Sequence, residues 1–371
     1  MRVLHINCNY TGTALHQLMI EKLSDLEIEN QVFAATYDKN SVVIKPNENV
    51  CICECFKKWD RFIFDYKQKK IMSALEKQYD VSSFDLIHAY TLFTDGNSAR
   101  ELSKKYGIPY VVAIRNTDVN VFFRLMPHLR SRGVQIMQDA AAIFFLSEPY
   151  RKQVFEKYVP EKCRLEIAQK TYIIPNGIDD FWLQNIPTVQ KSIDKKAIKL
   201  VYAGRIDHNK NIPTTQKAME LLREQGIEAT LTVVGKIQDK HEFEKISKDK
   251  FTTYLPAMPK EKLIDIYRQS DIFVMPSHTE TFGLVYAEAM SQGLPVIYTK
   301  GQGFDGQFEE GTVGYHVKSS STLEIADCIK KVVFNYNEIS QSCMKGSKCF
   351  KWCTIVKKYM NIYNSVIRGM K

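Results

Sequence analysis

The sequence predicts an α/β protein with two doubly wound domains in tandem, each built on a parallel sheet. Three observations favour this fold class. Short apolar runs alternate with amphipathic stretches along the chain, which is the pattern of strand, crossover helix and parallel strand. A polar interval at 184–199 interrupts the alternation, which then restarts. The length of 371 residues is enough for two substantial cores.

In the first half, Val3–Ile6 reads as a strand and residues 14–23 as a helix with Leu15, Leu18, Met19 and Leu23 on one face. Further strands are predicted at 31–35, 86–88, 110–114, 143–146 and 172–174. We place the domain boundary inside the polar interval, so that the first domain spans residues 1–188 and the second spans 189–350.

In the second half, strands are predicted at 199–204, 229–235, 272–276 and 295–298. A helix is expected from about Leu284 to Gln292, where Gly293 can occupy the left-handed position that ends it. Residues 351–371 hold a terminal amphipathic helix. Two such domains would leave a central cleft between the carboxyl ends of their strands, where α/β folds bind ligands.

The composition bounds the function. No apolar run approaches the roughly 18 to 20 residues of a membrane span, and polar residues come too early at the start for a signal peptide, so we expect a cytoplasmic protein. The nine cysteines are odd in number and form no Cys-x-x-Cys pair. Cys51, Cys53 and Cys55 alternate as on one strand face, so reduced thiols are expected.

The net charge of +9 is unevenly placed. Residues 56–70 interleave basic and aromatic side chains, and the segment after Gln341 holds seven basic residues and no acidic one. Such surfaces suit anionic lipid headgroups or a phosphorylated acceptor. A solvated helix face explains them equally well. Nucleic acid is not expected as a partner, because no recognised motif accompanies the charge.

The segment that follows the strand at 199–204 places Arg205 and Lys210 at a strand's carboxyl end. A guanidinium can donate two hydrogen bonds to phosphate oxygens, and an ammonium can act as a point charge beside them, so a diphosphate is the ligand expected here. The alternative is a pair of exposed surface cations.

Two carboxylates, Glu280 and Glu288, flank seven uncharged residues. The first belongs to a loop and the second to a helix, so their roles should differ. Between them, Gly283 lets a ligand approach backbone amides at a helix N-terminus, which would hold an anion. Glu288 could accept hydrogen bonds from a ribose diol. Its neighbours are apolar, and a buried carboxylate without a partner is costly, so we expect a partner.

Together these motifs resemble glycosyltransferase family 4, the retaining nucleotide-sugar glycosyltransferases of GT-B fold. The resemblance covers nearly the whole chain. Gly204-Arg205 through Lys210-Asn211, followed by Glu280-x7-Glu288, is similar to the family's donor site. Asp85-Leu86-Ile87-His88-Ala89 resembles its first-domain strand, and Ile174-Pro175-Asn176-Gly177-Ile178-Asp179 resembles the segment before its linker.

The resemblance implies a retaining transfer of a sugar, with UDP as the expected nucleotide, to a glycan or lipid-linked acceptor, as in bacterial surface polysaccharide or glycolipid synthesis. The acceptor would bind the first domain and the donor the second, and residues 351–371 would return to the first. Arg205 and Lys210 would bind the diphosphate, Glu280 the sugar and Glu288 the ribose. The other donor-binding residues implied are Gly12, Gly204, Gly235, Met258, Phe282, Gly283 and Leu284.

No cofactor or metal is expected, because the chain has no Asp-x-Asp to hold a divalent ion and fixed cations would take its place. The protein could act at the inner face of a membrane if the basic clusters bind lipid.

Departures from the family's pattern affect the first domain. Its first loop, Thr11-Gly12-Thr13, keeps one glycine of a common pair. Arg115-Asn116-Thr117-Asp118 stands where the family has His-Gly-Thr-Asp, so Arg115 either contacts the sugar or serves an anionic acceptor, and Asp118 is assigned to the same region. His88 either faces the cleft or is a structural histidine.

Three other functions need to be distinguished from sugar transfer. A nicotinamide-dependent oxidoreductase shares the fold class, but the first loop of neither domain shows Gly-x-Gly-x-x-Gly. A sugar-nucleotide epimerase of GT-B fold and a catalytically silent glycan-binding relative remain as alternatives.

Overall fold

The computed structural model describes residues 1–12, 14–39 and 48–369. Thr13 of the first loop and Lys371 of the basic C-terminal segment lie outside the described residues. The chain divides into two compact units. The first comprises Met1–Leu146, Tyr150–Gly177 and Trp352–Lys371, and the second comprises Ser147–Pro149 and Ile178–Lys351.

The first unit is built on a seven-stranded sheet in the order β3-β2-β1-β4-β5-β6-β7, and all its neighbouring strands are parallel. Its strands are β1 (Arg2–Ile6), β2 (Glu29–Thr36), β3 (Val50–Glu54), β4 (Leu86–Ala89), β5 (Tyr110–Ile114), β6 (Ala142–Phe145) and β7 (Thr171–Ile173). Its helices are α1 (Ala14–Ser24), α2 (Phe64–Gln78), α3 (Thr94–Tyr106), α4 (Arg130–Asp139), α5 (Glu148–Lys157), α6 (Glu161–Gln169) and α14 (Trp352–Arg368), with shorter turns η1 (Tyr10–Gly12), η3 (Lys58–Phe62), η4 (Val81–Ser83), η5 (Asp118–Phe123) and η6 (Pro127–Leu129).

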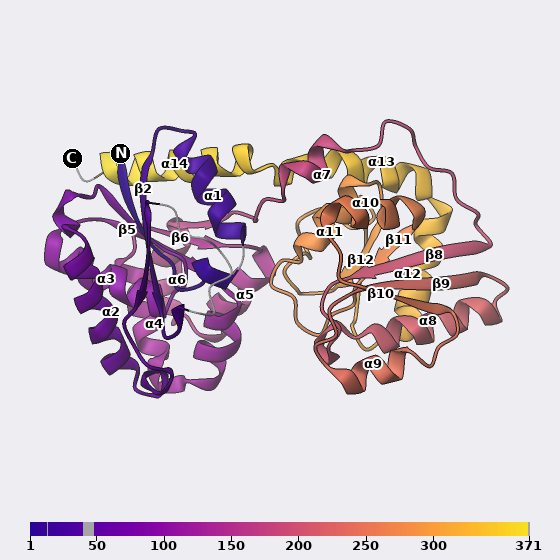
Figure 1. Cartoon of the computed structure of the whole chain (residues 1–371), viewed down its shortest axis with the longest axis horizontal. Coiled ribbons are helices and arrows are strands. Elements are labelled where there is room, and N and C mark those ends of the chain that lie inside the picture. The colour runs from indigo at the N-terminus through magenta and orange to yellow at the C-terminus, as the bar shows by residue number, and fades with distance from the viewer. Residues whose placement is uncertain (13, 40–47, 370–371) are drawn as a thin grey trace. The chain divides into compact units, whose positions relative to one another are not determined.

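Alternation along the strands produces two cores, one on each face of this sheet. Leu4 and Ile6 of β1 pack on the face covered by α2 to α6, whereas Val3 packs on the face covered by α1 and α14. Helices α1 and α14 lie side by side although they come from opposite ends of the sequence (Figure 1). The apolar face of α14 is therefore buried against the sheet, and its exposed face carries Lys357 and Lys358.

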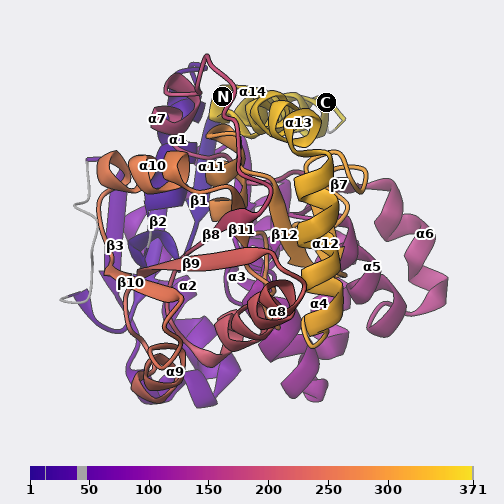
Figure 2. The ribbon, with the colours of Figure 1, turned by 90° about the vertical axis from the view of Figure 1, so that its right-hand side faces the viewer.

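The second unit is built on a six-stranded parallel sheet in the order β10-β9-β8-β11-β12-β13. Its strands are β8 (Ala197–Ala203), β9 (Glu228–Gly235), β10 (Thr252–Pro256), β11 (Ile272–Val274), β12 (Val296–Thr299) and β13 (Gly314–Val317). Its helices are α7 (Asp180–Gln184), α8 (Ile212–Glu224), α9 (Lys240–Ile246), α10 (Lys260–Gln269), α11 (Leu284–Ser291), α12 (Thr322–Phe334) and α13 (Tyr336–Ser347), with turns η7 (His208–Lys210) and η8 (Lys348–Phe350). Helices α8 and α12 pack side by side along it (Figure 2).

The predicted α/β fold class is confirmed: both sheets are parallel and strands alternate with helices. The division of the chain differs from the predicted boundary between residues 188 and 189, because the structure divides it after Gly177. The segment beyond Gly177 joins the second unit through Asp179, which pairs with Lys260, and through Trp182, whose carbonyl accepts from Gln292. The polar stretch at 184–199 is a poor marker of the domain boundary, because residues before it already pack in the second unit.

All nine cysteines are free thiols. In the part of the chain that the structure describes, no helix is both long and apolar enough to cross a membrane.

Candidate active site

The candidate site lies at the carboxyl edge of the second sheet, where the strand order reverses. Strand β8 has β9 on one side and β11 on the other, so the loops after β8 and β11 leave from the switch point of the sheet. The loop after β8 contains Arg205 and ends in η7. The loop after β11 contains Glu280 and leads into α11. The fold thus brings together residues that lie about 70 positions apart in the sequence.

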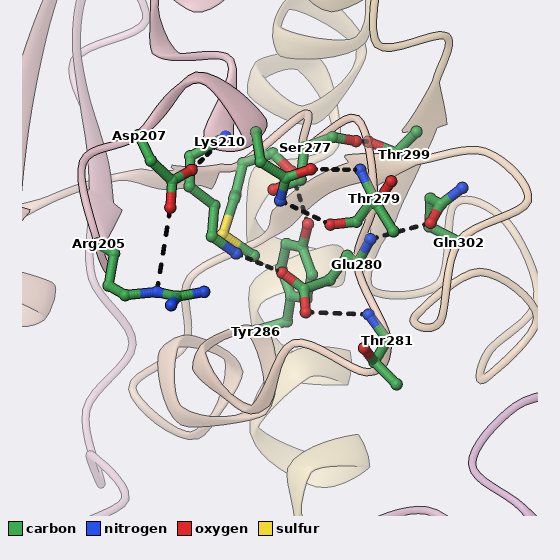
Figure 3. Close-up of polar contacts among 12 residues, drawn as sticks. Arg205, Asp207, Lys210, Ser277, Thr279, Glu280, Thr281, Tyr286, Thr299 and Gln302 are labelled. Carbon is green, nitrogen blue, oxygen red and sulfur yellow. Dashed lines mark hydrogen bonds and ion pairs between the residues drawn. The ribbon is translucent and has the colours of Figure 1, made fainter. Parts of the chain in front are cut away.

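An ion pair joins these two loops. The Nζ of Lys210 lies 2.6 Å from the Oε2 of Glu280, and the two side chains are 13% and 14% exposed (Figure 3). The sequence assigned these residues separately to phosphate and sugar, and nothing in it indicated that they would pair with each other. In the unliganded protein each therefore neutralises the other.

Backbone hydrogen bonds hold Glu280 in place. Its own N–H donates to Oε1 of Gln302 at 2.9 Å, and its Oε1 accepts from the N–H of Thr281 at 3.1 Å. Its carbonyl accepts from the N–H of Gly303 at 2.8 Å, where a Cβ would lie 1.7 Å from the carbonyl oxygen of Thr281. The segment after β12 therefore supports the loop. Sequence reasoning missed Gln302, and no motif marks it.

Asn209 fixes the same loop from the other side. Its Oδ1 accepts from the N–H of Thr279 at 3.0 Å, and its Nδ2 donates to the carbonyl of Thr279 at 2.9 Å. The N–H of His278 donates to the carbonyl of Asn209 at 2.8 Å. The two loops thus form one rigid unit of structure, and Lys210 and Glu280 are positioned by their neighbours as well as by each other.

Arg205 is arranged differently from Lys210. Its side chain is 67% exposed, and its Nε lies 4.0 Å from Oδ2 of Asp207 (Figure 3). Asp207 also caps η7, because Oδ1 accepts from the N–H of Lys210 at 3.2 Å. The guanidinium is therefore largely in solvent, where a ligand phosphate can reach it without displacing a buried partner.

The N-terminus of α11 stands beside the ion pair. Gly283 precedes it with φ of 74°, a left-handed conformation that favours glycine, and a Cβ there would lie 2.5 Å from the ring of Tyr286. The side chain of Phe282 is buried against Phe350, so only its backbone can serve a ligand. The first N–H groups of a helix lack an intrahelical acceptor, which suits those of Leu284 and Val285 to an anion, whereas the N–H of Tyr286 donates to the carbonyl of Gly283 at 3.0 Å.

Glu288 lies one turn inside α11 and differs from Glu280 in its surroundings. Burial, and to a lesser degree the negative charge of Asp179, raises the pKa of the Glu288 carboxyl to about 7, while Lys260 opposes the shift. Lys260 forms its ion pair with Asp179 instead. Within the described ranges, no hydrogen-bond or ion-pair partner of the Glu288 carboxyl is found. The partner expected from the sequence is thus not supplied by these residues.

Gly204, Gly235 and Met258 lie at the carboxyl ends of the neighbouring strands β8, β9 and β10. A Cβ on Gly235 would lie 1.7 Å from the carbonyl oxygen of Gly204, so the loop after β8 passes directly over the end of β9. Gly235 pairs in register with Pro256, and half-buried Met258 follows in the loop after β10. These residues, which the resemblance assigns to donor binding, therefore lie on neighbouring strand ends.

Two of the first-unit residues lie in fully buried surroundings. His88 is fully buried, its Nδ1 lies 2.6 Å from the hydroxyl of Tyr363, and burial lowers its pKa well below the ordinary value. Of the two open interpretations, the structural histidine is favoured. Asp118 is also fully buried, and its oxygens accept from the backbone N–H groups of Leu92, Phe93 and Arg115 at 3.0, 3.2 and 2.9 Å. Its carboxylate is therefore engaged by the backbone and holds these loops together.

Arg115 remains a candidate for contact with a ligand. It follows β5, it is half-buried, and its Nη1 donates to Oδ1 of Asn176 at 3.3 Å while the buried Nε has no partner among the described residues. Gly12 ends η1 in open space, where a Cβ would meet nothing within 4 Å, so the structure gives no steric reason for a glycine there.

The chain is similar to known proteins both in part of its second unit and over most of its length. Residues 187–348 match the family model described as "Glycosyl transferases group 1". The D-inositol 3-phosphate glycosyltransferase of Paenarthrobacter aurescens is 23% identical over 309 residues, which cover 77% of this chain and 74% of that protein. The protein of the same name from Pseudarthrobacter chlorophenolicus is 26% identical over 269 residues, or 67% of this chain and 62% of that protein.

Two solved structures resemble the whole chain. Sucrose-phosphate synthase from Thermosynechococcus elongatus aligns with a TM-score of 0.77 at 16% identity and covers 100% of both chains. The Anabaena protein HepE in complex with UDP and glucose aligns with a TM-score of 0.69 at 17% identity and covers 98% of this chain and 100% of that one. Residues 187–348 are therefore similar to the glycosyl transferases group 1, and the chain as a whole has the GT-B fold.

Proposed function

We propose that this protein is a retaining, metal-independent glycosyltransferase that moves a hexose from a UDP-sugar to a glycan or lipid-linked acceptor. The observation that carries the proposal is the arrangement of Lys210, Glu280 and the N-terminus of α11 at the switch point of the second sheet. This arrangement offers two cations, free amides and two carboxylates of different character within one pair of loops. UDP is proposed as the nucleotide because a similar solved structure was obtained with UDP and glucose.

The donor would use each group differently. Arg205 would bind the diphosphate from solvent, and the amides of α11 would bind it from the helix end. Lys210 would neutralise the leaving diphosphate, a preorganised electrostatic role typically worth several kcal/mol. Glu288 would accept hydrogen bonds from the ribose hydroxyls, which would give its unpaired carboxyl the partners that the described residues do not supply. Glu280 would contact the transferred sugar.

Transfer breaks the bond between the anomeric carbon and the donor phosphate oxygen. An acceptor hydroxyl forms the new bond on the same face of the sugar, and a donor phosphate oxygen takes its proton, so configuration is retained. In this scheme the protein supplies positioning and charge stabilisation, and no side chain acts as general base. A role in bacterial surface polysaccharide or glycolipid synthesis at the inner face of the membrane is part of the proposal.

A ligand screen followed by a turnover assay tests this function. UDP at about 100 times its dissociation constant should stabilise the fold by about 2.7 kcal/mol, which raises Tm by about 5 to 10 °C. The best UDP-sugar should then label a glycan acceptor in the presence of EDTA, and the product should keep the anomeric configuration of the donor. If no nucleoside diphosphate raises Tm, the donor site is wrongly assigned. Interconversion of the sugar without an acceptor would identify an epimerase instead.

A further inference from the structure

We propose that the first unit docks on an anionic bilayer through an exposed apolar strip formed by Trp59, Phe62, Ile63 and Tyr66. These side chains are 75%, 68%, 62% and 49% exposed. Trp59 and Phe62 belong to turn η3, Ile63 lies between η3 and α2, and Tyr66 lies in the first turn of α2. The proposal locates the contact face for the membrane association suggested above, but it rests on this surface and not on the donor site.

The strip is formed where turn η3 meets helix α2. Turn η3 ends at Phe62, and the backbone of Ile63, with φ of −116° and ψ of 86°, separates it from α2, so the four side chains come from two short segments that meet at Ile63. The rings of Trp59 and Phe62 lie beside each other, with centroids 5.9 Å apart. Helix α2 already packs on the core through other residues, Ile71 and Leu75. The strip is therefore a separate, largely exposed apolar surface beside the part of α2 that faces the core, and single scattered apolar residues would not produce it.

A neighbouring segment extends the apolar surface. Phe64 of α2 packs edge-on against Phe122, with ring centroids 6.2 Å apart, so the helical turn around Phe122 lies beside the strip. Leu125 follows one helical turn after Phe122 and is 66% exposed. The exposed apolar residues thus come from two segments of the first unit.

The charges around the strip indicate that its binding partner is anionic. Residues 57–70 contain six basic and two acidic residues. Both acids are paired, Asp60 with Lys70 at 2.7 Å and Asp65 with Arg132. Lys57, Lys58 and Lys69 are exposed. Amphipathic aromatic side chains rimmed by lysines are suited to the headgroup region of an anionic leaflet, where each cation adds to the attraction.

Sedimentation with vesicles tests the docking surface on the full chain without a donor. The protein should pellet with vesicles of phosphatidylglycerol and phosphatidylcholine and remain in solution with phosphatidylcholine alone. Trp59→Ala with Phe62→Ala should lower the fraction bound, expressed as a partition coefficient, at least about tenfold. Lys57→Glu with Lys69→Glu should lower it by a similar factor. Neither pair should lower Tm, because all four side chains are exposed.

Matched controls distinguish binding through this surface from binding that depends only on net charge or on any exposed aromatic ring. Lys357→Glu with Lys358→Glu lowers the net charge by the same amount on the exposed face of α14, and Phe334→Ala removes an equally exposed ring from the second unit. Both controls should bind vesicles as the unaltered chain does. If Lys357→Glu with Lys358→Glu weakened vesicle binding as much as Lys57→Glu with Lys69→Glu does, the docking surface would be refuted.

Tryptophan fluorescence locates the contact directly. The chain has three tryptophans, and Trp182 and Trp352 are each 2% exposed, so a blue shift on adding anionic vesicles reports Trp59. Trp59→Phe should abolish the shift and leave pelleting nearly unchanged. Pelleting without a blue shift would overturn the proposal. Self-association lost in Trp59→Ala with Phe62→Ala would assign the strip to a second copy of the chain. Transfer to a water-soluble acceptor should be unaffected by these variants, so failure here leaves the donor-site proposal standing.

Discussion

Breaking the ion pair between Lys210 and Glu280 from either side should have the same effect on stability and opposite effects on UDP binding. At 2.6 Å the pair has a gross Coulomb energy of about 6 kcal/mol at an effective dielectric constant of about 20. Removing one partner of a fully buried pair costs about 3 to 5 kcal/mol. Because both side chains retain some exposure, we expect each of Lys210→Ala and Glu280→Gln to lower the free energy of unfolding by about 2 kcal/mol.

The effects on UDP follow from which partner is left. In Lys210→Ala the diphosphate loses a charge-assisted hydrogen bond of about 1.5 to 3 kcal/mol, so Kd for UDP should rise about 10- to 150-fold. In Glu280→Gln the lysine no longer has a competing carboxylate, so UDP should bind as tightly as before or up to about tenfold more tightly. Transfer should be lost in both, because the sugar loses its contact in the second variant and the leaving group loses its cation in the first.

Urea unfolding measures the stability change, and titration calorimetry with UDP measures Kd. Lys191→Ala serves as a control, because Lys191 forms a 2.5 Å ion pair with Asp271 in the same unit but outside the site. It should lower stability without changing Kd. If Glu280→Gln weakened UDP binding as much as Lys210→Ala does, Glu280 would belong to the diphosphate site and the assignment of the two carboxylates would be wrong.

Three further predictions concern single residues. Because burial raises the pKa of Glu288 to about 7, the unfolded chain loses this proton near pH 4.5 and the folded chain near 7, so the unliganded protein should lose stability as pH rises between these values. UDP affinity should rise over pH 6 to 8, by at most tenfold per unit, and Glu288→Gln should flatten that profile in calorimetry. Gly235→Ala should lower Tm by several degrees and abolish the UDP-induced shift, because its Cβ would meet the backbone of Gly204. Asp118→Ala should cost about 3 to 5 kcal/mol in urea unfolding, since it leaves three backbone N–H groups of Leu92, Phe93 and Arg115 without their acceptor; a loss below 1 kcal/mol would contradict its positioning role.

Most strands that sequence reasoning found are buried on both faces and read as apolar runs, with the partly buried edge strand β7 as an exception. The strands β10 and β13 were not predicted, and both lie at sheet edges, where Thr252–Pro256 and Gly314–Val317 mix polar and apolar residues. An edge strand needs only one neighbour, so its sequence carries a weaker signal.

For the site, local motifs located the loops but not their partners. The pairing of Lys210 with Glu280, the support from Gln302 and the backbone contacts of Asp118 all join segments far apart in sequence. Such contacts depend on which loops leave the same edge of a sheet, and strand order decides that. A carboxylate that binds three backbone amides and one that binds a ligand look the same in a motif.

The return of the chain to its first unit bears on how the protein is made. Helix α14 contributes Trp352, Ile355 and Tyr363 to a core that also contains residues of the first strands, and Tyr363 bonds to His88. A Cβ on Gly177 would lie 2.4 Å from the indole of Trp352, so the end of the first stretch is shaped to receive it. The other elements of the first unit are therefore synthesised before the helix that covers one face of their core, and that core can be completed only after α14 has been synthesised. A truncation that removes α14 would therefore damage the first unit and not the second, to which the deleted residues are adjacent in sequence.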